Sequence, residues 1–248
     1  MNRIKKFFWI GLWLVFVTPS FAQIQNRYLD ELGDCLRSQT PLACYKAYYA
    51  HWDAALNATY QEVLNITPDD AGKNALRVAQ RAWITYRDAE GALAFGVSAN
   101  NAAHRYDRLA LVTRDRVRYW RMFLLASGEE DLYTQEAADQ RLSSCIDRNT
   151  GMREQSRVMR GRCYEAARQD WDVLLNEAYQ NALRTLNTKG KALLKTSQRN
   201  WLAYRTAEVA YMVLGLESLD AARRRSESIY GLNRLRALDL RNAYEDRD

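Results

Sequence analysis

The sequence predicts an all-α protein made of two similar small helical bundles in tandem. The chain has three prolines, Pro19, Pro41 and Pro68, so its second half contains none. Strong helix formers such as Ala, Leu, Arg, Glu and Gln are frequent throughout, and no stretch alternates apolar with polar residues as a half-buried strand does. Two long phrases also occur twice, which indicates that one helical unit has been duplicated.

The first 22 residues have the layout of a secretory signal. A short basic segment, MNRIKK, precedes the apolar run FFWIGLWLVFV, and the small residues Ser20 and Ala22 follow. This order predicts cleavage after Ala22 and export to the periplasm or outside the cell. The apolar run is shorter than the ~20 residues of a spanning helix, although an uncleaved membrane anchor is the alternative. No Cys stands at the predicted cleavage site, which argues against a lipid anchor.

Removal of this segment changes the charge balance of the chain. The precursor has 36 basic and 30 acidic residues. The first 22 residues contain Arg3, Lys5 and Lys6 and no acid, so 33 basic residues remain against the same 30 acids, a net charge of +3. That modest value does not favour a nucleic-acid-binding protein.

The duplication defines the expected domains. The phrase WDAALNATYQEVL (52–64) matches WDVLLNEAYQNAL (171–183), and AQRAWITYRDAE (79–90) matches SQRNWLAYRTAE (197–208). Two units of this length fit two compact domains better than a solenoid of shorter repeats. We expect a signal at 1–22, a first domain at 23–128 and a second at 129–248, with the boundary near ASGEED (126–131).

Each unit contains a long amphipathic helix that carries the first phrase. Trp52, Leu56, Tyr60 and Val63 follow one another at steps of four, four and three residues, which place them on one helical face. The segment ITPDD then ends this helix. We expect Thr67 to cap the next helix, with Pro68 at its first position and acidic residues in its first turn.

The remaining helices follow by the same reasoning. The segment LNTKG in the second unit has the place of ITPDD, between a helix that ends near Leu186 and one that carries Trp201 and Arg205. A helix with the first Cys should precede each long one. A final helix should close each unit, at 102–125 and at 219–244. Helical hairpins of this kind bury their aromatic faces against each other as a small bundle.

The aromatic members of the second phrase predict a packed core. Trp83 and Tyr86, like Trp201 and Tyr204, lie three residues apart and share a helical face. Each buried ring of this size removes about 150–250 Å² from water, so one Trp for each helix can anchor a small bundle.

The polar members of the phrases predict a semi-buried network in each repeat. Asn57 and Asn176 are poor helix formers, yet each lies inside a helix four residues after an aspartate. We expect such a network to fix the helix register, because an unpaired buried charge costs several kcal/mol. Ligand binding by the same clusters is the alternative. The two sets are Asp53, Asn57, Gln80 and Arg87, and Asp172, Asn176, Gln198 and Arg205.

Catalytic and metal-binding patterns are weak in this sequence. Asp53 with Glu90, and Asp172 with Glu208, are carboxylate pairs of the kind that hydrolases use, but nothing around them indicates a raised pKa. The two histidines, His51 and His104, have no counterpart in the second repeat. No zinc-protease, nucleophile-elbow or phosphate-loop motif occurs. We therefore expect no catalytic residue, no metal ligand and no cofactor.

Two basic segments allow two interpretations. Thr113–Arg121 alternates arginine with other residues, and Arg223–Arg225 begins the last expected helix. A solvated helix face is the simpler interpretation. The other is contact with an anionic wall polymer or membrane, to which each near-surface cation contributes ~1 kcal/mol.

The arrangement of these motifs resembles the LprI-type lysozyme-inhibitor domains of exported bacterial proteins. Two nearby cysteines are followed by D-x-x-L-N-x-x-Y and then by Q-R-x-W-x-x-Y-R, and the resemblance covers nearly all of the chain after residue 22. The matching positions are Asp53, Leu56, Asn57, Tyr60, Gln80, Arg81, Trp83, Tyr86 and Arg87, and again Asp172, Leu175, Asn176, Tyr179, Gln198, Arg199, Trp201, Tyr204 and Arg205.

The resemblance implies one disulfide in each domain. Four cysteines follow the signal, two in each half, and an even count in an oxidising compartment favours bridges. Family members often carry another Cys after the Tyr-Arg pair, where this chain has Gly91 and Val209. The implied pairs are then Cys35–Cys44 and Cys145–Cys163.

The expected function is that of an exported, non-enzymatic envelope protein that binds and inhibits a lysozyme-like peptidoglycan hydrolase. The protein partner is implied by the resemblance, and the slight positive charge opposes binding to a basic lysozyme while leaving exposed arginines available to cleft carboxylates. The alternatives are a carboxylate-dependent hydrolase and a structural protein that contacts anionic membrane or wall polymer.

Overall fold

The computed structural model describes residues 21–99, 101–123, 137–149 and 154–244. Within these ranges the chain forms helices and no strand, which confirms the all-α prediction. The helices are α1 (Phe21–Ser38), α2 (Pro41–Ile66), α3 (Asp70–Val97), α4 (Asn101–Phe123), α5 (Ala137–Asp147), α6 (Glu154–Thr185), α7 (Thr188–Val213) and α8 (Ser218–Tyr244). None of these described helices is both long and apolar enough to cross a bilayer. Residues 1–20 of the expected signal and the expected boundary at 126–131 lie outside the described residues.

The start of α3 differs from the sequence prediction. Thr67 lies at the C-terminal cap of α2, and its hydroxyl donates to the Val63 carbonyl at 2.7 Å. Asp69 caps α3 instead, because its carboxylate accepts from the Gly72 backbone N–H at 2.7 Å. The prediction of Thr67 as the cap was wrong because Pro68 holds the preceding residue in extended backbone, which ends α2 there. In the second unit Asn187 caps α7 in the same way as Asp69.

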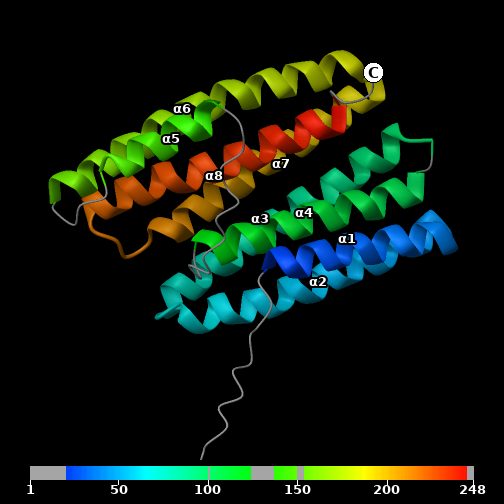
Figure 1. The fold of residues 1–248 in the computed structure, drawn as a ribbon, viewed down its shortest axis with the longest axis horizontal. Helices are drawn as coiled ribbons and strands as arrows, with labels where there is room; N and C mark the ends of the chain where they lie inside the picture. The colour runs from blue at the N-terminus through cyan, green and yellow to red at the C-terminus, as the bar shows by residue number, and fades with distance from the viewer. Residues whose placement is uncertain (1–20, 100, 124–136, 150–153, 245–248) are drawn as a thin grey trace, which may run out of the picture.

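The helices form a row in which the two repeats meet through α3 and α7. Helix α2 packs on α4, α4 on α3, α3 on α7, α7 on α8, and α8 on α6. Figure 1 shows α1 and α2 at one edge of the molecule, α5 and α6 at the other, and α3, α4, α7 and α8 between them. Helix α3 packs more extensively on α7 of the other repeat than on α4 of its own.

One hydrophobic core runs through both repeats. Trp52, Trp83, Trp120 and Trp171 are at most 1% exposed and belong to the same buried cluster. The two implied disulfides are confirmed: Cys35–Cys44 joins α1 to α2, and Cys145–Cys163 joins α5 to α6. The disulfides thus fix the outer helices, while the second repeated phrase lies on α3 and α7 in the middle of the molecule.

Candidate functional site

The aromatic residues of the second phrase meet at the interface of α3 with α7. Trp83, Tyr86, Trp201 and Tyr204 are all buried. The rings of Tyr86 and Tyr204 stack with centroids 5.9 Å apart and planes inclined by 7°. These two tyrosines occupy the same position in the two repeats, so their contact lies on a pseudo-twofold axis between α3 and α7.

Arg116 of α4 joins the two repeats through one buried guanidinium. Its Nε donates to Gln80 Oε1 at 3.0 Å, within its own repeat. Its Nη1 donates to the Tyr204 hydroxyl at 2.7 Å and to Glu208 Oε2 at 3.0 Å, both in the other repeat. Trp120 Nε1 donates to the second oxygen of Glu208 at 2.7 Å. Glu208 is 0% exposed, so its charge depends entirely on these neighbours.

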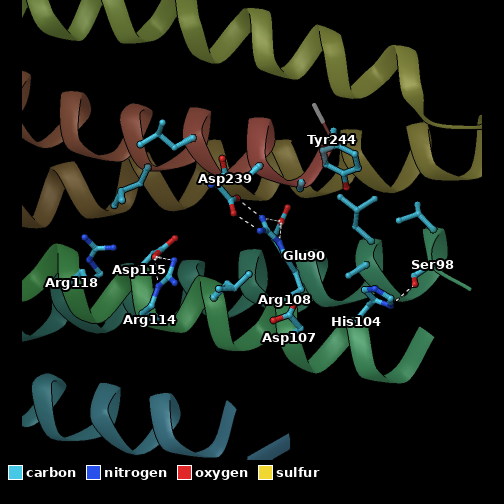
Figure 2. Close-up of a pocket in the computed structure, with 18 of the residues that line it drawn as sticks. Glu90, Ser98, His104, Asp107, Arg108, Arg114, Asp115, Arg118, Asp239 and Tyr244 are labelled. Atoms are coloured by element: carbon cyan, nitrogen blue, oxygen red, sulfur yellow. Dashed lines mark hydrogen bonds and ion pairs between the residues drawn. The ribbon is translucent and has the colours of Figure 1, made fainter. Parts of the chain in front are cut away.

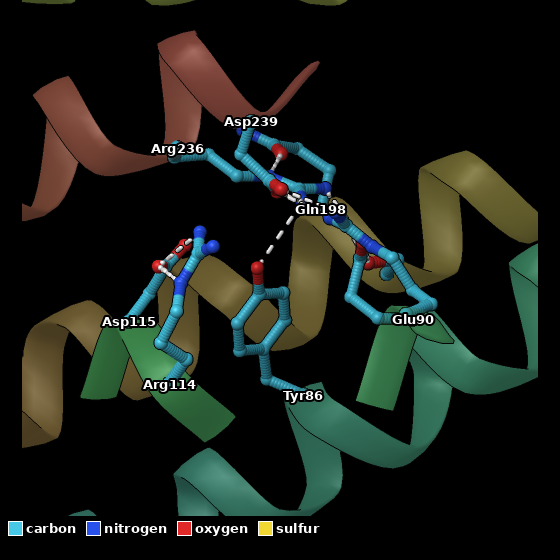
Figure 3. Close-up of polar contacts among 9 residues, drawn as sticks. Tyr86, Glu90, Arg114, Asp115, Gln198, Arg236 and Asp239 are labelled. Atoms are coloured by element: carbon cyan, nitrogen blue, oxygen red, sulfur yellow. Dashed lines mark hydrogen bonds and ion pairs between the residues drawn. The ribbon is translucent and has the colours of Figure 1, made fainter. Parts of the chain in front are cut away.

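Arg236 of α8 repeats this arrangement in the opposite direction. Its Nε donates to Gln198 Oε1 at 3.1 Å, and its Nη1 donates to the Tyr86 hydroxyl at 3.1 Å (Figure 3). Its Nη2 lies 3.0 Å from Glu90 Oε1. Each arginine therefore binds the glutamine of its own repeat and the tyrosine and glutamate of the other. The two repeats therefore contact each other through equivalent residues, as the two subunits of an isologous dimer do, although both belong to one chain.

The network around Glu90 contains additional charges. Arg108 of α4 donates to Glu90 at 2.6 Å and also pairs with Asp239 of α8, and the Ser197 hydroxyl donates to Glu90. Burial would raise the pKa of Glu90, but the Arg108 and Arg236 guanidiniums outweigh it and lower this pKa to about 2. Glu90 is therefore a permanent anion and not a proton donor at neutral pH.

The two networks differ at positions that the pseudo-twofold axis relates. Arg116 and Arg236 are 120 residues apart, and the same interval relates Arg108 to Ser228 and Tyr119 to Asp239. Ser228 and Tyr119 are both buried. The side that holds Arg108 and Asp239 has a charged cluster, whereas the other side is closed by neutral side chains.

The charged cluster lies in the wall of a cavity between α4 and α8. Figure 2 shows Arg108, Glu90 and Asp239 together between the two helices, and the cavity volume is about 520 Å³. Helix α3 also contributes to its wall. The apolar lining of the cavity includes Leu93, Leu111 and Leu238. The cavity combines residues of both repeats, so it exists only because the repeats are joined.

The carboxylates of the cavity are poorly suited to hydrolysis. Burial raises the pKa of Asp107, and nearby Arg108, His104 and Arg114 offset part of the rise. A glycosidase of the usual type needs a second, available carboxylate. The other three that line the cavity are ion-paired: Glu90 and Asp239 with Arg108, and Asp115 with Arg114. Across the described ranges no three His, Cys, Asp or Glu side chains are placed to hold a metal ion.

The first expected register network forms in part. Asp53 accepts from Asn57 Nδ2 at 3.4 Å and lies 3.8 Å from Arg87 Nη1, as expected. The oxygen of Gln80 accepts from Arg116 and not from a member of this cluster. The expectation for Gln80 was wrong because a helix outside the repeated phrase supplies the stronger, charged donor.

In the second expected network, Asn233 of α8 is the amide that donates to the aspartate, where the first network has Asn57. Arg205 Nη1 lies 3.9 Å from Asp172 and donates to Asn233 Oδ1, and Asn233 Nδ2 donates to Asp172 Oδ1 at 3.1 Å. Gln198 pairs with Arg236, as Gln80 does with Arg116, and Asn176 is exposed. Both networks hold one helix against another near the surface.

The remaining motif residues divide between core and surface. Tyr60 and Tyr179 are half-buried, and Tyr60 packs near Trp120 with ring centroids 6.0 Å apart. Arg81 and Arg199 are exposed on α3 and α7. The second phrase therefore combines buried aromatic residues with one exposed arginine in each repeat, Arg81 or Arg199.

The two basic segments are not uniformly solvated faces. Arg116 is 2% exposed, and Arg114 and Arg121 pair with Asp115 and Glu62. The solvated interpretation is therefore wrong for Arg116, because the helix turns this position into the repeat interface. Arg223 and Arg224 both pair with Glu227, and Arg225 is exposed.

The sequence did not predict the roles of Arg108, Arg116, Arg236 and Asp239 in joining the repeats. One signal was available for two of them. The final helices share the pattern Arg-x-Arg-x-x-x-x-Arg, at 114–121 and 234–241, so Arg116 and Arg236 occupy matching positions. No signal marks Arg108 and Asp239, since neither residue is repeated.

Comparison with known proteins agrees with the duplication. A family model described as lysozyme inhibitor LprI matches residues 35–119 and 145–242, one segment in each repeat. No curated protein and no solved structure matches the chain. The two matched segments contain Arg108, Arg116 and Arg236, the arginines described above that cross the repeat interface.

Proposed function

The chain belongs to the LprI family of lysozyme inhibitors, and from this membership we propose that it is an exported, non-enzymatic envelope protein that binds and inhibits a lysozyme-like peptidoglycan hydrolase. The observation that carries the proposal is the family match in both repeats. Two disulfides support export, because such bridges persist in oxidising compartments.

The state of the carboxylates supports binding over catalysis. Glu90 and Glu208 are buried and held by guanidiniums, so neither is available to protonate or attack a substrate. Each would have to leave a buried ion pair first, at a cost of several kcal/mol. Their role in the proposal is to join the repeats.

We place the contact with the hydrolase at the cavity between α4 and α8. Binding energy in protein interfaces concentrates where a side chain fills a pocket, and this cavity has apolar walls with charged groups at its edge. Arg118 lines the cavity and makes no ion pair with a carboxylate of the described chain. A glycosidase cleft carries two carboxylates, and arginine pairs with a carboxylate in bidentate geometry.

The test is the clearing of a cell-wall suspension by a panel of lysozyme-like hydrolases, with and without the purified protein. Inhibition is expected for at least one hydrolase. Arg118→Glu should weaken that inhibition at least tenfold, because it replaces attraction by repulsion at the cleft. Arg225→Glu, the same charge change on the exposed part of α8, should leave it unchanged.

Two results would contradict this proposal. One is the absence of inhibition across the panel. The other is lysis by the protein alone that disappears in Asp107→Asn or Asp53→Ala, which would support the carboxylate-dependent hydrolase instead.

A further inference from the structure

Helices α3 and α7 each carry a row of three cations. The rows follow an i, i+4, i+8 spacing, which places their members on one helical face about 12 Å long. The second row lies 118 residues after the first, so it occupies the same positions of the repeat. We call these residues the cationic face. They are Lys73, Arg77, Arg81, Lys191, Lys195 and Arg199.

The cations of this face lack acidic partners. None forms an ion pair within 4.0 Å of a carboxylate in the described chain, whereas arginines elsewhere, such as Arg121 with Glu62, do. Five of the six are exposed and Lys73 is half-buried. Two exposed carboxylates, Asp70 and Asp88, share this side of α3, and Asp88 accepts from Arg87 at 2.8 Å. The face therefore keeps a net positive charge.

The cationic face points away from the cavity. Side chains of α3 that line the cavity include Glu90 and Leu93. Residues advance by about 100° along a helix, so Arg77 and Arg81 lie on roughly the opposite side of α3 from these two. The reciprocal packing of α3 on α7 turns the second row to the same side as the first.

Exposed apolar side chains lie among the cations. Val78 and Ile84 of α3 are 48% and 36% exposed, and Leu202 of α7 is 42% exposed. Cations mixed with apolar side chains are typical of surfaces that lie on a membrane interface. An acidic enzyme cleft is concave and fits this broad two-helix face less well than a planar array of phosphates.

We propose that the cationic face docks on an anionic lipid bilayer, with its six cations next to headgroup phosphates. Each near-surface cation strengthens such binding roughly fivefold. Both repeats contribute equally, and the cavity is left open on the side away from the bilayer. This surface differs from the two basic segments noted in the sequence, whose arginines are largely paired or buried.

The experiment is co-sedimentation of the mature chain with phosphatidylcholine vesicles prepared with and without phosphatidylglycerol. We expect binding only with phosphatidylglycerol, and its loss at 1 M NaCl, where the Debye length falls to about 3 Å. Glutamine at all six positions should lower the partition coefficient at least 100-fold, and glutamine in either row alone should give equal, smaller losses. Glutamine preserves helix propensity, so circular dichroism should be unchanged.

A matched control removes three other exposed cations, Arg105, Arg148 and Arg225. This control should change partitioning less than fivefold. The proposal is overturned if the chain binds equally well to vesicles with and without phosphatidylglycerol. It is also overturned if the three-residue control loses as much binding as a variant that lacks one row of three. It is also overturned if the six-residue variant loses hydrolase inhibition but still binds vesicles, because the face then contacts the hydrolase. Normal inhibition by that variant would leave the proposed function intact whatever the vesicles show.

Discussion

Replacing Arg116 by methionine tests whether the two repeats are held together by crossed ion pairs. Methionine keeps an unbranched apolar stem but has no charge and no donor. Glu208 would remain fully buried and would keep the hydrogen bond from the Trp120 indole, and Gln80 and Tyr204 would each lose a hydrogen bond. Removal of one partner of a buried pair costs about 3–5 kcal/mol. That is a large share of the 5–15 kcal/mol that stabilises a typical protein.

The equivalent change at Arg236 should cost less. Glu90 would keep Arg108 and the Ser197 hydroxyl, so its charge stays compensated, and we expect a loss of about 2 kcal/mol. The two variants are compared by urea denaturation followed by circular dichroism. Arg116 and Arg236 occupy equivalent positions in the sequence repeat. The prediction that the Arg116 variant loses more stability therefore rests on the structure alone.

A second substitution separates loss of charge pairing from loss of packing. Glu208→Leu in the Arg116→Met background removes the uncompensated anion, and replacement of a buried ion pair by apolar residues is often neutral. The double variant should therefore recover most of the lost stability. Equal losses in the two single variants, or no recovery in the double one, would refute the reasoning.

Three further predictions concern the fold. Because the pKa of Glu90 is lowered from 4.5 to about 2, its contribution to stability is present above pH 4.5 and is lost as pH falls toward 2; Glu90→Gln should therefore remove roughly 3 kcal/mol of the pH dependence of unfolding in this window. Replacing Cys145 and Cys163 by serine should lower stability by about 3 kcal/mol, measured by urea denaturation, since their bridge closes a loop of 18 residues. Residues 23–128 and 129–248, produced as separate chains, should each be unstable or self-associate, and mixing them should restore the native circular dichroism spectrum, because α3 and α7 bury each other's core faces.

Much of the helical framework could be predicted from the sequence. Apolar spacing located the long helices, and the duplication related one unit to the other. The cap of α3 was misplaced because Asp69 and Thr67 are both good capping residues, and the choice depends on the backbone that Pro68 imposes. Local patterns therefore identify elements more reliably than their ends.

The partners of the buried polar residues could not be predicted in the same way. Helical periodicity shows which residues share a face, but it does not show which helix that face meets. Gln80 was expected to join Asp53, and Glu90 was considered only as a catalytic carboxylate. Their true partners, Arg116 and Arg236, lie on the last helix of each repeat, and Arg236 reaches Glu90 from the other repeat.

The two proposed functions explain why the cationic rows occur in both repeats while the charged cluster of Arg108 and Asp239 occurs only once. Attraction to an extended array of phosphates grows with every cation, so both copies can retain a cationic row with benefit. Recognition of a single partner requires one site of defined shape, and two equal sites on opposite sides of the axis would serve it no better. The networks are accordingly equal at Arg116 and Arg236 but unequal at Arg108 and Asp239, where Ser228 and Tyr119 close the other side. On the proposals made above, the duplication supplies a symmetric face for the bilayer and an asymmetric cavity for the hydrolase, held on opposite sides of α3 by the same crossed ion pairs.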